Sequence, residues 1–158
     1  MSVVAPGTPV PDFVLMRGDG SDFTRDDLLG TTTVLVFYPF AFSPVCTDQL
    51  QVYEEALPEL RERGVQMYGV STDATWSQTA FQEKLGVSIE QLSDFEPKGA
   101  TARKLGAYFE PAGMTDRALV IVGPDAVVIW SHLADAPGDL PGVNLIFDAL
   151  AGDEASAA

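Results

Sequence analysis

Apolar and polar positions near the N-terminus follow the spacing of short strands. Residues 13–15 and Phe23 flank a polar, turn-rich stretch at 17–22, which predicts a short antiparallel hairpin. Residues 34–38 then form a run that is apolar on both faces of an extended chain. That pattern is typical of a central strand covered by helices on both sides. Pro39 should end this strand, because proline cannot donate a hydrogen bond to a sheet.

A long helix and a second strand and helix follow. The helical spacing of apolar residues predicts a helix over 44–63, which Gly64 ends. Pro58 should kink or divide this helix. Residues 65–71 form the next predicted strand, and residues 76–85 form an amphipathic helix. The order strand, helix, strand, helix calls for parallel strands joined by a crossover connection.

The last part of the chain adds an antiparallel element. Residues 118–122 and 127–133 are apolar and flank a Gly-Pro-Asp-Ala turn, which predicts a second hairpin. Short helices are expected over 100–105 and 143–150. A hairpin joined to parallel strands makes the sheet mixed. We therefore predict an α/β fold, a thioredoxin-like three-layer sandwich with a central mixed β-sheet and an N-terminal β-hairpin.

Length and composition agree with a single domain. The chain has 158 residues, of which 46% are hydrophobic, and this is enough to bury a core without disulfides. Residues 152–158 are small and polar, so we expect them to be a disordered, fraying tail. The folded domain is accordingly assigned to residues 1–151.

No membrane span is predicted. Residues 28–47 carry no charge and match the roughly 20 residues that cross a bilayer. They also contain Gly30, Pro39 and Pro44, so we interpret them as a loop, a short strand and another loop. The N-terminus lacks the basic cluster and apolar run of a secretory signal. We therefore expect a cytoplasmic protein.

The net charge and the presence of only one cysteine and one histidine exclude several classes of function. The 9 basic and 23 acidic residues give a net charge of −14, which would repel nucleic acid and anionic membranes. One cysteine, Cys46, cannot form an internal disulfide or a multi-cysteine metal site. One histidine, His132, cannot form a histidine cluster, and its use with Cys46 would require the two side chains to meet in space. We expect neither metal nor cofactor.

The most informative chemistry lies between the predicted central strand and the helix that follows it. In open α/β sheets, ligand sites lie beyond the carboxyl ends of the strands. Ser43 is a good N-cap and Pro44 fits the first helical position, so Cys46 is expected at the third. Free backbone amides at that position favour the thiolate over the thiol. The alternative is that this cysteine is only a small buried hydrophobic residue.

A resemblance to a known family favours the chemical interpretation. The spacing of Pro39, Ser43 and Cys46 resembles the peroxiredoxin signature, in which proline, serine or threonine, and cysteine stand at these intervals. Arg117, just before a predicted strand, is the candidate for the arginine of that signature. Further similarity lies at residues 7–13, 69–71, 92–95 and 114–117. The chain is similar to one-cysteine peroxiredoxins of the alkyl hydroperoxide reductase E type.

The resemblance implies a function and roles for the matching residues. It implies a thiol-dependent peroxidase that reduces hydrogen peroxide or alkyl hydroperoxides through a Cys46 sulfenic acid. Pro39 would shield the sulfur from water, Ser43 would bind the peroxide, and Arg117 would stabilise the thiolate and the peroxide oxygens. The resemblance also implies a homodimer and an external reductant, either a small thiol or a thioredoxin-, glutaredoxin- or mycoredoxin-like protein. The sequence specifies neither the preferred peroxide nor the reductant.

Two alternatives stay open at this stage. Arg117 could instead be a solvated charge at a strand end, paired with Asp116. Many relatives have glutamate three residues after the cysteine, whereas this chain has Gln49, which cannot offer a carboxylate to an arginine. This difference leaves the orientation of the arginine undetermined. It also suggests a second function, a non-catalytic redox sensor or binding protein with the same fold.

Overall fold

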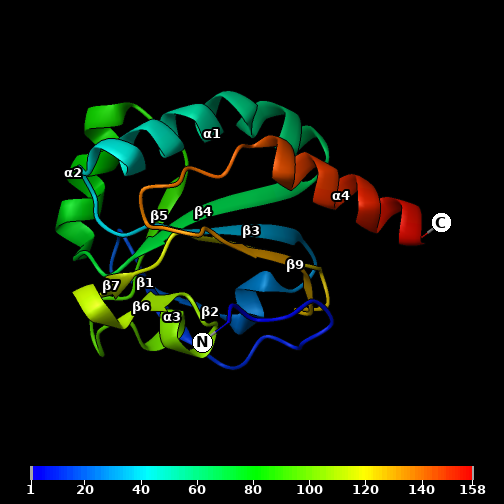
Figure 1. Ribbon diagram of the computed structural model, residues 1–158, viewed down its shortest axis with the longest axis horizontal. Helices are drawn as coiled ribbons and strands as arrows, with labels where there is room; N and C mark the ends of the chain where they lie inside the picture. Colours follow the sequence, from blue (N-terminus) through cyan, green and yellow to red (C-terminus); the bar gives the residue numbers. More distant parts are fainter. Residues whose placement is uncertain (1, 158) are drawn as a thin grey trace.

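A seven-stranded sheet with the order β2-β1-β5-β4-β3-β8-β9 runs through the middle of the computed structural model, which describes residues 2–157 (Figure 1). Its strands are β1 (Val14–Arg17), β2 (Asp22–Thr24), β3 (Thr32–Phe37), β4 (Val65–Ser71), β5 (Glu90–Ser93), β8 (Ala118–Val122) and β9 (Val128–Leu133). The α-helices are α1 (Pro44–Glu62), α2 (Thr75–Leu85), α3 (Ala100–Lys104) and α4 (Asn144–Ala157). Two-residue strands β6 (Tyr108–Phe109) and β7 (Met114–Thr115) and two 3₁₀ helices, η1 (Arg25–Leu28) and η2 (Glu110–Ala112), complete the described elements.

The sheet is mixed, as the sequence predicted. Strand β3 pairs in parallel with β4 and antiparallel with β8, and β4 pairs in parallel with β5. Strand β1 pairs antiparallel with both β2 and β5, which confirms the N-terminal hairpin. Strands β8 and β9 form the second predicted hairpin. Strand β3 is therefore an interior strand of the sheet, flanked by β4 and β8.

Two hydrophobic clusters cover the two faces of the sheet. Alternate residues of a strand point to opposite faces. Leu35 and Phe37 of β3 accordingly belong to one cluster, and Val34 and Val36 belong to the other. Helices α1, α2 and α4 pack on the Val36 side, whereas α3 and the N-terminal segment pack on the Phe37 side (Figure 1). The predicted three-layer, thioredoxin-like arrangement is confirmed.

Strand β5 is the main element that the sequence pattern did not predict. Its residues, Glu90–Ser93, do not form a predominantly apolar run. Gln91 is nevertheless almost fully buried, and its side-chain oxygen accepts a hydrogen bond of 2.7 Å from the Tyr38 hydroxyl. A buried polar residue satisfied by a distant partner gives no local signal, so a pattern of hydrophobic residues cannot reveal this strand.

Helix α1 is not divided at Pro58, although the sequence raised that possibility. The helix runs without a break from Pro44 to Glu62 with Pro58 inside it. Pro58 lies on the exposed face, where water can hydrogen-bond the carbonyl that the missing amide leaves free. Gly64 follows the helix with a φ of 74°, a left-handed conformation that suits glycine.

Helix α4 is longer than the predicted 143–150. It continues to Ala157 and extends away from the body of the molecule at its C-terminal end (Figure 1). Side chains 151–155 are exposed, so this last part buries little apolar surface. The disordered tail expected from residue 152, and with it the domain boundary at 151, stays a prediction about the protein in solution; Ala158 lies outside the described residues. Within residues 2–157, no helix is both long and apolar enough to cross a membrane.

Candidate active site

The loop after β3 and the start of α1 position Cys46. Tyr38 extends the pairing of β3, since its amide donates to the Val70 carbonyl, and Pro39 follows as a buried residue. Ser43 has the extended backbone of an N-cap, and its hydroxyl accepts a hydrogen bond of 3.3 Å from the Cys46 amide. Pro44 is the first residue of the helix, which places Cys46 in its first turn. The predicted N-cap is therefore present, and the sulfur lies fully buried beside the free amides of a helix N-terminus.

Sheet register brings Arg117 to Cys46, although 71 positions separate them in the sequence. Phe37 pairs with Ala118 across β3 and β8, so the residue before Ala118 lies at the carboxyl end of β3. Arg117 is 1% exposed, and its Nη2 donates to Cys46 Sγ at 3.3 Å. The interpretation of Arg117 as a solvated strand-end charge is wrong. Asp116 accepts a hydrogen bond from the Arg117 backbone amide, rather than from its guanidinium.

The remaining guanidinium donors contact neutral acceptors. Nε donates to the Pro137 carbonyl at 2.7 Å, and Nη1 donates to Gln49 Oε1 at 2.6 Å. Among residues 2–157, no carboxylate forms a salt bridge with Arg117. A buried guanidinium keeps its charge, and an uncompensated buried charge is costly. The Cys46 sulfur, 3.3 Å from Nη2, is the remaining partner of this charge.

Gln49 therefore occupies the position beside the arginine that the resemblance had left undetermined. Its Nε2 donates to the Tyr53 hydroxyl at 3.2 Å, and that hydroxyl donates to the Pro141 carbonyl at 2.6 Å. Burial raises the pKa of Tyr53 to about 12, so its hydroxyl stays protonated at neutral pH. Tyr53 was not among the site residues predicted from the sequence. Its distance of four residues from Gln49, one helical turn, was the available signal.

The loop that precedes Cys46 is held from the side of β4. Asp73 Oδ2 accepts hydrogen bonds from the Ala41 amide at 2.8 Å and from the Ser71 hydroxyl at 2.7 Å. Phe42 has a φ of 71°, a left-handed conformation that costs a non-glycine residue on the order of 1 to 3 kcal/mol. Its ring contacts that of Phe81, with centroids 5.1 Å apart. Packing and hydrogen bonding thus hold a strained loop in one conformation next to the sulfur.

His132 is not part of this site. It lies on β9, where its ring stacks on that of Trp130 with centroids 5.9 Å apart. The hydrogen bond at the Cys46 sulfur comes from Arg117 instead. Within the described part of the chain, no group of three or more His, Cys, Asp or Glu side chains could hold a metal ion.

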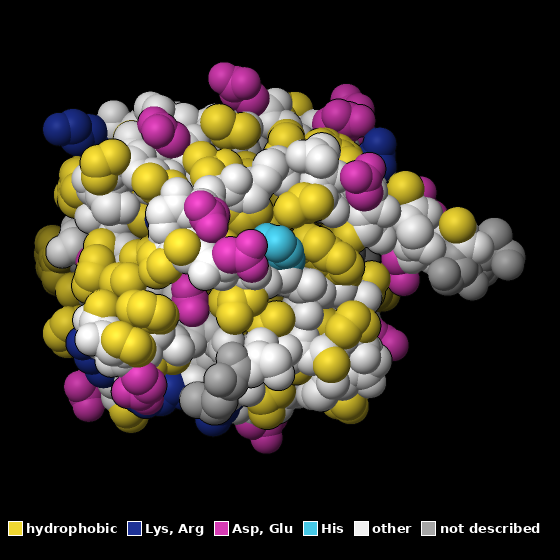
Figure 2. Space-filling view, viewed as in Figure 1, with side chains coloured by type: hydrophobic (Ala, Val, Ile, Leu, Met, Phe, Trp, Pro, Cys, Tyr) yellow, Lys and Arg dark blue, Asp and Glu magenta, His cyan; other side chains and the backbone are white. Residues whose placement is uncertain are grey.

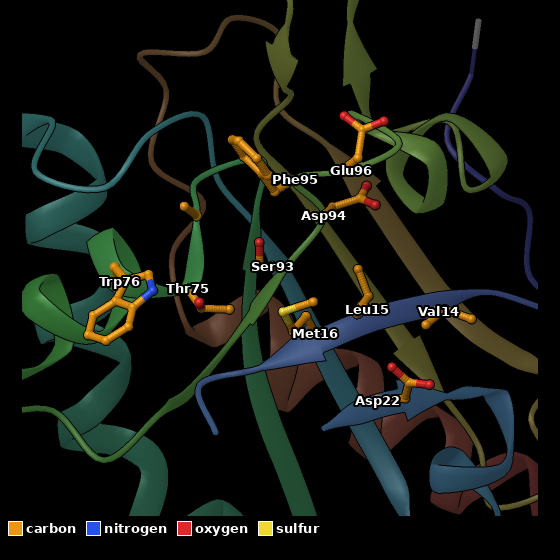
Figure 3. A pocket seen from close by; sticks show the side chains of 11 residues that line it. Val14, Leu15, Met16, Asp22, Thr75, Trp76, Ser93, Asp94, Phe95 and Glu96 are labelled. Atoms are coloured by element: carbon orange, nitrogen blue, oxygen red, sulfur yellow. The ribbon is translucent and has the colours of Figure 1, made fainter. Parts of the chain in front are cut away.

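A separate cavity of about 300 Å³ lies beyond the end of β5, between β1 and the start of α2. Figure 3 shows Met16 on β1 and Trp76 on α2 at two sides of this cavity, with Phe95 above them. Its lining includes none of Pro39, Ser43, Cys46 and Arg117. The three apolar side chains are exposed, Trp76 to 87%, so the cavity is part of an apolar surface rather than of the reaction centre.

The thioredoxin-like sheet, with a buried cysteine in the first turn of the helix that follows β3, is the arrangement typical of cysteine-based redox proteins. Comparison with known sequences narrows this class. Residues 6–131 match the profile of the AhpC/TSA family, and the chain belongs to this peroxiredoxin family.

Individual relatives agree with this assignment. Alkyl hydroperoxide reductase C of Amphibacillus xylanus is 35% identical over 114 residues, which cover 69% of this chain but only 61% of the relative. Alkyl hydroperoxide reductase E of Mycobacterium tuberculosis is 28% identical over 146 residues, covering 92% of this chain and 95% of the relative. The crystal structure of Enterococcus faecalis AhpC superposes with a TM-score of 0.87 at 27% identity, covering 98% of this chain and 95% of that one. The predicted similarity to the E type is confirmed.

Proposed function

We propose that this protein is a thiol-dependent peroxidase that reduces hydrogen peroxide or alkyl hydroperoxides at Cys46. The contact of 3.3 Å between Arg117 Nη2 and the buried Cys46 sulfur carries this proposal. A protonated guanidinium at that distance stabilises a thiolate, and the thiolate is the nucleophilic form of cysteine. Membership of the AhpC/TSA family supports the same reaction.

In the proposed reaction, the Cys46 thiolate attacks the distal oxygen of the hydroperoxide. A sulfur–oxygen bond forms as the oxygen–oxygen bond breaks, so the sulfur loses two electrons and the peroxide gains them. The leaving oxygen takes a proton and departs as an alcohol or water, and Cys46 becomes a sulfenic acid. An external thiol then displaces the sulfenic oxygen as water to form a mixed disulfide, and a second thiol restores Cys46.

We assign the supporting roles to three further residues. Arg117 stabilises the negative charge that develops on the leaving oxygen, because a fixed buried donor needs no reorganisation during the reaction. The Ser43 hydroxyl binds the peroxide, and the half-buried position of this residue at the helix start is compatible with that role. Pro39, buried in the same loop, keeps water away from the sulfur.

A redox sensor without turnover is the alternative function. It was suggested by Gln49, which leaves the arginine without a carboxylate. The hydrogen bond from Arg117 to Gln49 supports the peroxidase, because the amide oxygen orients the guanidinium as a carboxylate could. Repeated turnover decides between the two functions, since a sensor does not need to recycle. The deciding experiment is stopped-flow oxidation by several peroxides, followed by rescue with a small thiol and with thioredoxin-, glutaredoxin- and mycoredoxin-like reductants.

Oxidation by one equivalent of peroxide should add one oxygen atom to the reduced chain. No second cysteine exists to form an intrachain disulfide, so the sulfenic acid should accumulate, and excess peroxide should convert it to sulfinic acid. Intact mass spectrometry should therefore detect first one and then two added oxygen atoms. Cys46→Ser is the control and should show neither product. Complete conversion to a disulfide dimer through Cys46 would contradict this prediction.

We also propose that two copies of the chain form a homodimer near the active site. Phe40 and Phe42 on the loop before Cys46 are 42% and 49% exposed, and Trp76 at the start of α2 is 87% exposed. Phe109, on β6, is half-buried and can add to the contact. Light scattering at micromolar concentration should give twice the mass of one chain, and Trp76→Glu should lower it. A monomer mass for the parent protein would refute the dimer.

The free thiol and the net charge indicate the cellular compartment and the kinds of partner. A free thiol that must be reduced after each turnover suits a reducing compartment, and we place the protein in the cytoplasm on this ground. The net charge of −14 makes nucleic acid and anionic membranes unsuitable partners. Figure 2 shows acidic side chains spread over one face, with basic side chains at its margins.

A further inference from the structure

A chain of hydrogen bonds connects the Pro141 carbonyl to the Arg117 guanidinium. Tyr53 donates to the Pro141 carbonyl at 2.6 Å, and Gln49 Nε2 donates to the Tyr53 oxygen at 3.2 Å. Arg117 Nη1 in turn donates to Gln49 Oε1 at 2.6 Å. Tyr53, Gln49 and Arg117 are all buried to within 1% of full burial. Water therefore has little access to replace any of these bonds.

Each hydrogen bond in this series can run in only one direction from donor to acceptor. A backbone carbonyl can only accept, so the Tyr53 hydroxyl must donate its proton to Pro141. The tyrosine oxygen then accepts from Gln49, which fixes the amide nitrogen of Gln49 on the Tyr53 side. The amide oxygen must consequently face Arg117, whose guanidinium has donors only. Tyr53 therefore specifies which end of the Gln49 amide the guanidinium meets.

The segment that contains Pro141 also holds the Nε edge of the guanidinium. Arg117 Nε donates to the Pro137 carbonyl at 2.7 Å, four residues before Pro141. With Nε on Pro137 and Nη1 on Gln49, the plane of the guanidinium is set, and Nη2 lies against the Cys46 sulfur. A glutamate at position 49 would attract Arg117 by its charge in either orientation of its carboxylate. A glutamine accepts a hydrogen bond from Arg117 only when its amide oxygen faces the guanidinium.

We propose that Tyr53 is a positioning residue for the peroxidase reaction, acting through Gln49 on the orientation of Arg117. The inference rests on the proposed function. Without the Tyr53 hydroxyl, the Gln49 amide loses the acceptor that holds its nitrogen and can rotate. In the rotated state, two sets of N–H donors face each other across Gln49 and Arg117, and the guanidinium turns away from the sulfur and from the developing charge on the peroxide.

Tyr53→Phe tests this proposal with the loss of a single oxygen atom. Stopped-flow reduction of hydrogen peroxide should slow about 10-fold, the effect of roughly one net hydrogen bond. Tyr68→Phe is the matched control, because it also removes a tyrosine hydroxyl that hydrogen-bonds a glutamine side chain, here by donating to Gln66 Oε1 on β4, away from the sulfur. It should react within twofold of the parent. A rate for Tyr53→Phe within twofold of the parent overturns the proposal.

A second measurement separates positioning from a general loosening of the fold. Alkylation of Cys46 requires the thiolate, whereas peroxide reduction requires the thiolate and an oriented guanidinium. At a pH where alkylation no longer rises, the ratio of the peroxide rate to the alkylation rate should fall about 10-fold in Tyr53→Phe, as expected for the loss of one net hydrogen bond. A merely structural role would change both rates together and leave the ratio unchanged, which contradicts the proposal.

A double-mutant cycle tests whether the effect passes through Gln49. If Tyr53 acts through this amide, Tyr53→Phe combined with Gln49→Leu should be no slower than Gln49→Leu alone, because the amide that Tyr53 orients is absent. Additive losses would show that Tyr53 acts by another route and overturn the inference. An inactive parent protein would instead refute the proposed function, and this inference with it.

Discussion

Arg117→Ala should slow the reduction of hydroperoxide by about 10²- to 10³-fold, the usual cost of removing one preorganised donor to developing charge. The guanidinium is 1% exposed and touches the sulfur directly, so water cannot easily take its place. Stopped-flow kinetics of the reduced protein measure the effect. Arg63→Ala is the control, because Arg63 pairs with Glu59 and lies over the Phe147 ring at the opposite end of α1 from Cys46, and its loss should change the rate little.

Arg117→Lys should not restore what Arg117→Ala loses. The native side chain uses three separate nitrogen atoms, on Pro137, Gln49 and Cys46. A planar guanidinium reaches all three acceptors at once, whereas an ammonium is a compact charge on a flexible stem. The lysine variant should therefore stay far below the parent rate. If both variants fold normally and react within a few-fold of the parent, Arg117 has no part in the reaction and the site assignment fails.

Phe81→Ala should lower the free energy of unfolding by about 3 to 5 kcal/mol, as expected for a large-to-small change in a core. The Phe81 ring on α2 is fully buried, and its centroid lies 6.0 Å from that of Tyr38 and 5.1 Å from that of Phe42. Its removal leaves a cavity between α2 and the loop that precedes Cys46. Equilibrium unfolding in urea measures the change.

The control for this prediction is Phe95→Ala, the same substitution at a side chain that is 56% exposed. It should cost much less, because most of the Phe95 ring already contacts water in the folded state. A loss below about 1 kcal/mol for Phe81→Ala would show that α2 closes over the space, and that this ring does not hold the loop.

Local patterns predicted the central part of the fold well. Strand β4 begins and ends where the run from Val65 to Ser71 predicted, and β3 is an interior strand between β4 and β8, although β4 is the middle strand of the seven. The N-cap at Ser43 was also predicted, since capping depends on a few adjacent residues. These features share one property: their signal lies within a single segment of the chain.

The features that local patterns could not predict depend on distant partners. Strand β5 contains a buried glutamine that is satisfied by Tyr38, and no pattern within residues 90–93 reveals that bond. The burial of Arg117 depends on the register of β3 and β8. The acceptors on Pro137 and Pro141 are backbone carbonyls, which every residue carries, so sequence alone cannot select them. The functional orientation of the arginine therefore required the tertiary structure.

The neutral amide of Gln49 beside Arg117 has a consequence for the oxidised protein. In the proposed mechanism, a Cys46 thiolate and the Arg117 guanidinium of the reduced site would together carry no net charge. In the proposed cycle, a neutral sulfenic acid replaces the thiolate, and the guanidinium then keeps a positive charge in a nearly dry interior with no carboxylate against it. A carboxylate at position 49 would cancel that charge. In the proposed cycle, oxidation would therefore leave an uncompensated positive charge at the site, which would favour the binding of a reductant as its thiolate.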